Sequence, residues 1–319
     1  MKVIKLSAIF FLVICIAMLV AFPEIYVRSS FDGIKLWALV VLPTLLPFFF
    51  LTTALSSLGL IEKLSLIFAR PMKHLFGTSG ITAYAFISSV ISGYPVGAKI
   101  ICDLVENGII SRDEGTRAST FCSTSGPMFI IGSVGSAMFS DKKAGYILFI
   151  AHILSSIICG MIFRFYGKKE NGRSVLPVFG KRQSSVLYEC VYSSVISVAV
   201  VGGFISLFYL FADVAQNLKI TFPIEFILSL IVPKEIASGF SAGLIECTRG
   251  CLALSKCGLS SYSLSCACSV ISFGGISVWF QSIAFLSKAK TNVGVFALAK
   301  ICQAVISPAL CCLFFYLFF

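Results

Sequence analysis

Charged residues are scarce in this chain of 319 residues. Asp, Glu, Lys and Arg together make up 12% of the sequence, while 58% is hydrophobic. Soluble domains carry about 25% charged residues, so the deficit excludes an ordinary soluble protein and indicates one embedded in a lipid bilayer. At about 20 apolar residues per crossing plus connections, the length allows roughly eight to ten spans. The net charge of +11 does not indicate nucleic-acid binding, because the basic residues gather at the ends of apolar segments, as topology signals do.

Histidine is nearly absent, and catalytic motifs are missing. His74 and His152 are the two histidines, and no HExxH, phosphate-binding loop, dinucleotide fingerprint or ordered Ser/His/Asp set occurs. The 13 cysteines contain no CxxC pair and lie mostly within apolar runs. They are interpreted as small packing residues and not as zinc ligands or disulfides. His152 is interpreted as a hydrogen-bonded core residue, and we expect no enzyme, no cofactor and no metal.

What the chain does contain is a set of glycine breaks inside apolar sequence of membrane length. They are Ser92–Pro95, Ser123–Pro127, Ser238–Phe240 and Phe273–Gly275. A helix broken at membrane depth frees backbone groups that lipid cannot satisfy, so such breaks persist only inside protein or along a cavity. Matched breaks in two halves of a chain are typical of transporter binding sites.

The pattern predicts an all-α, polytopic helical membrane protein with two inverted repeats. Each repeat is expected to hold one broken helix and one re-entrant hairpin. In the first repeat, residues 81–105 are predicted to be the broken helix, and residues 112–138 the hairpin, with Ser123-Thr124-Ser125 at its tip. In the second, the half-length arms on either side of Gly274-Gly275 are predicted to form the hairpin.

The predicted organisation has four parts. Residues 1–76 would hold N-terminal spans and an interfacial amphipathic helix, and 77–166 the first repeat. Residues 167–183 would form a basic cytoplasmic loop, and 184–319 the second repeat with a C-terminal span. The first apolar run is interpreted as a retained span and not as a cleaved signal peptide, because it is long and lacks a small-x-small cleavage site.

Basic residues predict the orientation. With the N-terminus and the 167–183 loop in the cytoplasm, basic residues inside outnumber those outside by about two to one. This count places Lys256, Lys288 and Lys290 inside, and Arg112 and Arg117 outside. The first broken segment then enters from inside and the second from outside, as in many secondary transporters.

Four charged residues near the breaks are candidates for a solute site, since charges at membrane depth are costly. Lys99 and Asp103 are four residues apart, and Glu246 and Arg249 three, so each pair shares a helical face. They could face a cavity and contact a polar solute or ion, or they could be structural pairs that neutralise each other; the sequence leaves both open. Lys300 is expected near an interface, where its side chain can reach water.

The polar break residues are further candidates. Half-helix N-termini attract anions and exposed carbonyls at C-termini attract cations. Packing through small residues is the alternative, but packing alone does not require Gly-Pro in mid-segment. For Gln281, solute contact and helix cross-linking are both open, and for Tyr94 packing is preferred to gating. The full candidate set for a solute or ion is Gly93, Tyr94, Lys99, Asp103, Ser123, Thr124, Ser125, Gly126, Glu246, Arg249, Gly274, Gly275 and Gln281.

The sequence around the breaks resembles a known family. The runs Ser92–Lys99 and Phe121–Pro127, and Phe273–Val278 followed by Gln281-Ser282, look like those of the YlbJ-type sporulation integral membrane proteins, which carry the nucleoside-recognition or Gate domain. The resemblance covers roughly residues 35–290. It implies a multi-pass protein of the bacterial cell membrane linked to spore formation, and a distant relation to the hairpin-bearing core of concentrative nucleoside transporters. It does not establish a substrate, because a shared domain does not determine function.

Together these observations predict a transporter-like protein for a small polar solute or ion, involved in sporulation. The alternative is a non-transporting scaffold that assembles a membrane complex, in which the breaks would be packed without a solvated cavity. A second copy of the chain is a candidate partner, and nucleic acid is not. The sequence does not identify the solute, the coupling ion or the direction of transport.

Overall fold

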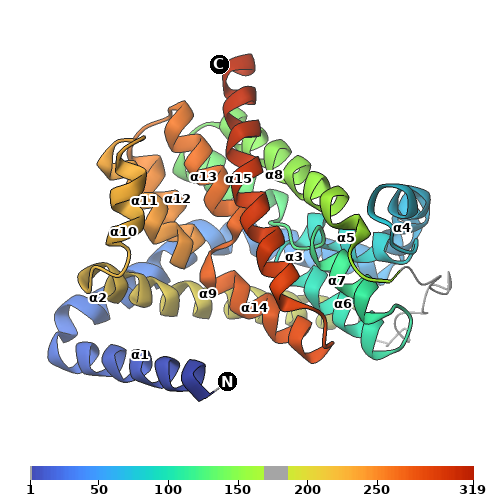
Figure 1. The fold of residues 1–319 in the computed structure, drawn as a ribbon, viewed down its shortest axis with the longest axis horizontal. Helices are drawn as coiled ribbons and strands as arrows, with labels where there is room; N and C mark the ends of the chain where they lie inside the picture. The colour runs from blue at the N-terminus through green and yellow to red at the C-terminus, as the bar shows by residue number, and fades with distance from the viewer. Residues whose placement is uncertain (1, 169–185) are drawn as a thin grey trace.

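The computed structural model describes residues 2–168 and 186–319, which are helical and contain no strand (Figure 1). Within them, five segments are long and apolar enough to cross a membrane: Pro23–Ser57, Lys142–Phe165, Leu187–Asn217, Ser261–Lys288 and Val293–Phe318. The predicted all-α, polytopic class is confirmed. Most of the predicted basic loop 167–183 lies outside the described residues.

After two N-terminal helices, α1 (Lys2–Ala21) and α2 (Pro23–Leu36), the helices follow one order twice. Each series has a long helix, a short helix, two half-length helices, an interrupted helix and a long closing helix. The first series is α3 (Leu42–Ser57), α4 (Leu60–Pro71), α5 (Thr82–Ser92), α6 (Val96–Glu106), α7 (Arg112–Ser119) with η3 (Met128–Met138), and α8 (Lys142–Ile162). The second is α9 (Val186–Asn217), α10 (Phe222–Ser229), α11 (Lys234–Ile245), α12 (Cys247–Lys256), α13 (Ser261–Phe273), α14 (Gly275–Lys288) and α15 (Val293–Phe318). Short π-helical or 3₁₀ turns adjoin α2, α4 and α8 over Trp37–Val41, Met72–Phe76 and Phe163–Phe165.

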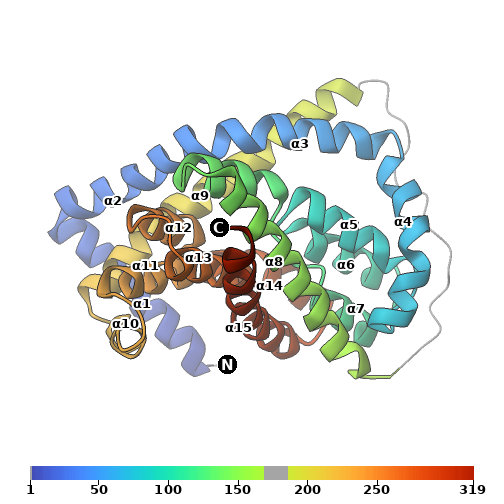
Figure 2. The ribbon, with the colours of Figure 1, turned by 90° about the horizontal axis from the view of Figure 1, so that it is seen from above.

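Two pairs of half-length helices form hairpins. α6 runs back along α5, since Ile81 just before α5 packs with Leu104 near the end of α6. α12 runs back along α11, where a Cβ added to Gly250 would lie 2.2 Å from the Cα of Gly243. Small residues let these backbones approach closely. Figure 2 shows the two hairpins on either side of α8, α14 and α15.

Two other helices are interrupted without reversing. An extended stretch separates α7 from η3; α7 packs on α6 and α15, and η3 on α8 and α3. Gly274, with φ of 87°, separates α13 from α14; α13 packs on α15 and α8, while α14 packs on α6. Because the two arms of each helix have different neighbours, the chain continues through the break and does not fold back.

This arrangement reverses part of the predicted assignment. Residues 81–105, predicted as a broken helix, form a hairpin, and 112–138, predicted as a hairpin, form an interrupted helix. The arms around Gly274-Gly275 likewise continue and do not form a hairpin. Ser238–Phe240 is no break, since α11 runs through it and Gly239 packs on α12. A glycine break shows that a helix is interrupted, but it does not encode whether the chain then turns back.

Contacts place the connections between helices at two ends of the molecule. At one end Lys288, the last residue of α14, donates to Glu106 of α6 at 2.8 Å. At the other end Ser261, at the start of α13, contacts Cys312 near the end of α15. The α5–α6 hairpin therefore opens toward the first end and the α11–α12 hairpin toward the second. This placement agrees with opposed hairpins; the inverted repeat itself stays a prediction.

The continuous path through α13 and α14 corrects the predicted sidedness of several basic residues. Lys256 and Lys288 lie at opposite ends, although both were predicted inside. Arg112, at the start of α7, lies at the end that carries residues 166–168, because Lys168 donates its backbone N–H to Asp113 at 2.9 Å. Arg112 and Arg117 of α7 therefore lie at the end predicted to be cytoplasmic, and Lys256 lies at the other end. The end predicted to be cytoplasmic still carries the larger number of basic residues.

Cys257 offers a test of this sidedness, because it is exposed and lies outside the candidate spans. If residues 166–168 face the cytoplasm, a membrane-impermeant maleimide should label Cys257 in intact cells, and Cys257→Ser should abolish that labelling. Partial burial and the Glu235 carboxylate raise the pKa of the Cys257 thiol. Since the thiolate is the reactive form, labelling should be slow at neutral pH and accelerate as pH rises. Labelling in inverted vesicles alone would contradict the topology.

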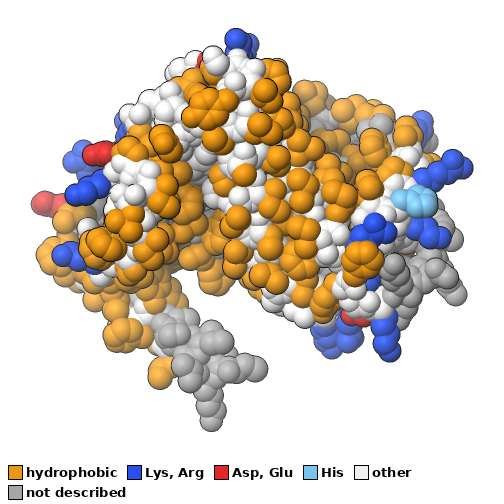
Figure 3. All heavy atoms as spheres, turned by 45° about the horizontal axis from the view of Figure 1, so that its top comes forward, with side chains coloured by type: hydrophobic (Ala, Val, Ile, Leu, Met, Phe, Trp, Pro, Cys, Tyr) orange, Lys and Arg blue, Asp and Glu red, His pale blue; other side chains and the backbone are white. Residues whose placement is uncertain are grey.

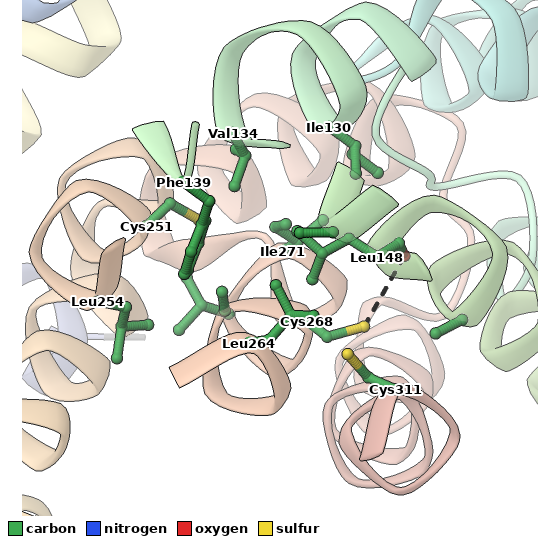
Figure 4. Packing of buried hydrophobic residues seen from close by; sticks show 14 of the residues in the cluster. Ile130, Val134, Phe139, Leu148, Cys251, Leu254, Leu264, Cys268, Ile271 and Cys311 are labelled. Atoms are coloured by element: carbon green, nitrogen blue, oxygen red, sulfur yellow. Dashed lines mark hydrogen bonds between the residues drawn. The ribbon is translucent and has the colours of Figure 1, made fainter. Parts of the chain in front are cut away.

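Apolar side chains cover most of the face drawn in Figure 3, with Lys and Arg toward its edges. Such a surface suits lipid and not water. The largest core cluster lies between η3, α8, α12, α13 and α15 (Figure 4). Cys251, Cys268 and Cys311 are buried among its apolar residues, in agreement with their interpretation as packing residues.

Candidate functional site

The two hairpin tips and the two helix breaks meet at the centre of the fold. A Cβ on Gly93, at the first tip, would lie 2.8 Å from the backbone nitrogen of Gly126 in the first break. A Cβ on Gly275, in the second break, would lie 3.1 Å from the backbone nitrogen of Cys247 at the second tip. Both glycines have positive φ, 78° and 71°. Glycine is therefore needed for conformation and for close approach at each meeting point.

Tyr94 joins the two halves across this centre. Its hydroxyl donates to the carbonyl of Ile271 in α13 at 3.2 Å. A Cβ on Gly274 would lie 3.6 Å from the Tyr94 ring. The first hairpin tip thus touches the second break as well as the first, which brings all four interruptions together.

A cavity of about 80 Å³ lies beside this meeting point. A buried water needs about 10–15 Å³ on this scale, so there is room for several waters or part of a small solute. One wall is polar and the other is apolar, formed by α3 and α9 with Phe48, Phe49 and Phe204 among others. Six of the predicted site residues line the cavity: Gly93, Tyr94, Ser125, Gly126, Glu246 and Gln281.

Glu246 is the one acidic side chain in the lining, and it is 2% exposed. Its carboxylate accepts the backbone N–H groups of Thr248 at 3.1 Å and Arg249 at 2.6 Å. It is the N-cap of α12, where backbone donors and the helix dipole stabilise a negative charge. The tip of the second hairpin therefore has Glu246 where the first has a glycine, and Glu246 lines the cavity.

The other three charged candidates, Lys99, Asp103 and Arg249, do not line this cavity. Arg249 reaches α9, where its guanidinium donates to Asp213 at 2.5 Å and to Gln216 at 2.8 Å. Lys99 is exposed and Asp103 is half-buried. Within the described residues the two ion pairs are Arg249–Asp213 and Lys288–Glu106, so neither predicted pair forms. Of the two alternatives left open by the sequence, self-neutralising pairs are not what the described residues form: Glu246 caps its own helix, while Arg249 reaches a neighbouring one.

The remaining candidates, Ser123, Thr124, Gly274 and Gly275, lie behind the cavity wall. Thr124 exchanges hydrogen bonds with Ser89 of α5, through its backbone N–H at 3.0 Å and its hydroxyl at 2.8 Å. The Ser123 carbonyl accepts from a buried lysine described below. These residues hold the tips and breaks together, and solute contact by them stays a prediction.

His152, on α8, connects the two breaks and is fully buried. Its Nε2 accepts the backbone N–H of Ser125 at 2.9 Å, and its Nδ1 lies 2.9 Å from the hydroxyl of Ser272. A backbone N–H can only donate, so Nε2 carries no proton and the neutral ring has its proton on Nδ1. The interpretation as a hydrogen-bonded core residue is confirmed, although the sequence did not reveal these partners.

Lys300, on α15, is also central, whereas the sequence placed it near an interface. The residue is 1% exposed. Its ammonium donates to the Tyr94 hydroxyl at 2.8 Å, the Ser123 carbonyl at 2.9 Å and the Gln303 side-chain oxygen at 3.1 Å. The prediction failed because hydropathy shows that α15 spans the membrane but not which neighbour its third turn faces.

These features define a multi-pass membrane protein with a transporter-type fold. The chain is similar to the solved structure of CNTnw, a concentrative nucleoside transporter, in an inward-facing substrate-bound state, with a TM-score of 0.61 over 94% of this chain and 86% of that one. The sequence identity is 11%, so this likeness shows the fold alone.

A sequence relative is the sporulation integral membrane protein YlbJ of Bacillus subtilis (strain 168). The identity is 28%, over 94% of this chain and 80% of that protein. This match confirms the resemblance to the YlbJ-type proteins. No family model matches the chain.

Proposed function

We propose that this chain transports a small polar solute or ion across a bacterial membrane, with the cavity beside the hairpin tips as its binding site. The observation that carries the proposal is the buried Glu246 carboxylate in the wall of a central cavity, next to backbone from both halves. Glu246 would accept hydrogen bonds from the solute, while Ser125 and Gln281 would contact its other polar groups. The facing apolar wall would exclude bulk water, which strengthens these contacts.

The relatives support the class of function and its setting. The fold is shared with a transporter, and the relative in Bacillus subtilis carries a name that refers to sporulation. A role during spore formation, a cytoplasmic N-terminus and the inverted relation of the two helix series belong to the proposal. The scaffold alternative predicted packed breaks without a cavity, and the cavity favours transport over it.

The test begins with thermal-shift screening of small polar metabolites, nucleosides included, on the purified chain. Uptake of a stabilising compound is then measured in proteoliposomes. Glu246→Gln should lower uptake about tenfold or more, since a hydrogen bond to a charged group contributes about 1.5–3 kcal/mol. Ser125→Ala should lower it less. Lys99→Gln, which also removes a charge but lies outside the cavity lining, should leave uptake unchanged.

Three outcomes separate the possibilities. Uptake that responds to Glu246→Gln but not to Lys99→Gln supports the proposed site. Uptake that is indifferent to both Glu246→Gln and Ser125→Ala would refute the site while sparing transport. If no compound stabilises the chain or enters the vesicles, the result favours the scaffold alternative over transport.

A further inference from the structure

Among the described residues, Lys300 is a buried cation that forms no ion pair. Its three hydrogen-bond acceptors are neutral oxygens of Tyr94, Ser123 and Gln303, and its ammonium lies 4.7 Å from the centre of the Tyr94 ring. The ion pairs found among the described residues are Arg249–Asp213 and Lys288–Glu106, so Lys300 has no carboxylate within ion-pair distance there. Burying a charge without a counter-charge is costly, so such a residue is expected to have a function.

The acceptors of Lys300 come from three separate parts of the chain. Tyr94 is at the first hairpin tip, Ser123 lies in the first break, and Gln303 is one turn further along α15. The ammonium thereby draws tip, break and closing helix together. Since Tyr94 also donates to Ile271 of α13, the same contact extends to the second break.

Other carbonyls near the first break are already bonded by side chains. Gln303 donates its amide to the Thr120 carbonyl at 2.8 Å, and Ser156 donates to the Phe121 carbonyl at 2.8 Å. Exposed carbonyls at a half-helix C-terminus form a natural cation site. In this chain the Lys300 ammonium donates to the Ser123 carbonyl at this position.

We propose that the Lys300 ammonium is a tethered cation that occupies an oxygen-lined monovalent-cation site between the first hairpin tip and the first helix break. The ammonium group has three N–H donors, and the site offers three acceptor oxygens, so every donor has an acceptor. Two consequences follow, and neither depends on which solute is carried. The wild-type protein requires no sodium or potassium for stability. Shortening Lys300 opens a site that a small dissolved cation can fill.

The test measures thermal unfolding of the purified full chain, followed by tryptophan fluorescence. Wild type, Lys300→Ala and Lys300→Met are compared in choline, sodium, potassium and methylammonium chloride at equal ionic strength. The wild type should unfold at the same temperature in all four salts. Lys300→Ala should lose about 5 °C or more in choline chloride, since buried acceptors are left unpaired. It should regain at least half of that loss in sodium or methylammonium chloride.

Lys300→Met is the matched control, because its side chain fills much of the space but cannot donate. It should be destabilised in every salt and regain nothing. The proposal is overturned if sodium or potassium stabilises the wild type relative to choline, or if no salt restores Lys300→Ala. If Lys300→Ala does not fold in choline chloride, the variant is purified in methylammonium chloride instead. Recovery of folded protein there, together with the salt series of the wild type, then decides the test. Failure of Lys300→Ala to fold in both media would also overturn the proposal.

Discussion

Replacing Gly97 with alanine should abolish the accumulation of folded protein in the membrane. Gly97 is in the first turn of α6, where a Cβ would lie 1.8 Å from the carbonyl oxygen of Cys122 and 2.9 Å from the Cβ of Ser89. The first obstacle is a backbone atom, and its neighbours on both sides are held by hydrogen bonds: the Phe121 carbonyl accepts from Ser156 and the Ser123 carbonyl from Lys300. It cannot move without breaking those bonds, so we expect a cost above about 3 kcal/mol, at the upper end of overpacked cores.

The matched control is Gly203→Ala, in α9. An added Cβ there meets nothing within 4 Å, and alanine favours a helix over glycine by about 1 kcal/mol. The measurement is the yield and monodispersity of a fluorescent-protein fusion extracted in mild detergent. Gly203→Ala should match the wild type, while Gly97→Ala should give little or no monodisperse protein. A normal yield of Gly97→Ala would show that α5, α6 and the first break do not pack as described.

Replacing His152 with phenylalanine should destabilise the protein by about 2–6 kcal/mol. Two buried groups would lose their partners, the Ser125 N–H and the Ser272 hydroxyl, and each unsatisfied group costs about 1–3 kcal/mol. His152→Gln should lie between wild type and His152→Phe, because an amide oxygen can still accept the Ser125 N–H. Thermal unfolding of the purified variants measures the order.

Ile150→Ala serves as the control on the same helix, since Ile150 is 47% exposed and faces away from the breaks. It should change the unfolding temperature little. If His152→Phe equals the wild type, or if His152→Gln is the less stable of the two, then His152 does not hold the breaks together through these hydrogen bonds.

The breaks themselves were predictable from local chemistry, but their direction was not. Gly93, Gly126 and Gly274 interrupt apolar sequence, and each lies at a helix interruption in the fold. Reversal depends on close contact between the arms, as at Gly243 and Gly250, and small residues that permit such contact also occur within ordinary packed helices. Gly239 is one of these, and for that reason it was mistaken for a break.

Two central residues illustrate what composition cannot reveal. Glu246 was predicted at the site, yet its role as the N-cap of α12 depends on a helix boundary with no glycine to mark it. Lys300 was expected at an interface because it is a single cation near the start of an apolar helix. Its position at the centre follows from the rotation of α15 toward Tyr94 and Ser123, which is a property of the tertiary structure.

The contacts of Lys300 also impose an order on biogenesis. Ser123 precedes Lys300 by 177 residues, and Thr120 precedes its partner Gln303 by 183. At about 5–20 residues per second, the ribosome needs on the order of ten to forty seconds to bridge that separation. Throughout that interval the newly inserted first series carries backbone carbonyls without their final partners. Membrane insertion of this chain therefore includes a vulnerable window, during which chaperones or proteases can act on a half-made protein, and translation of α15 closes it.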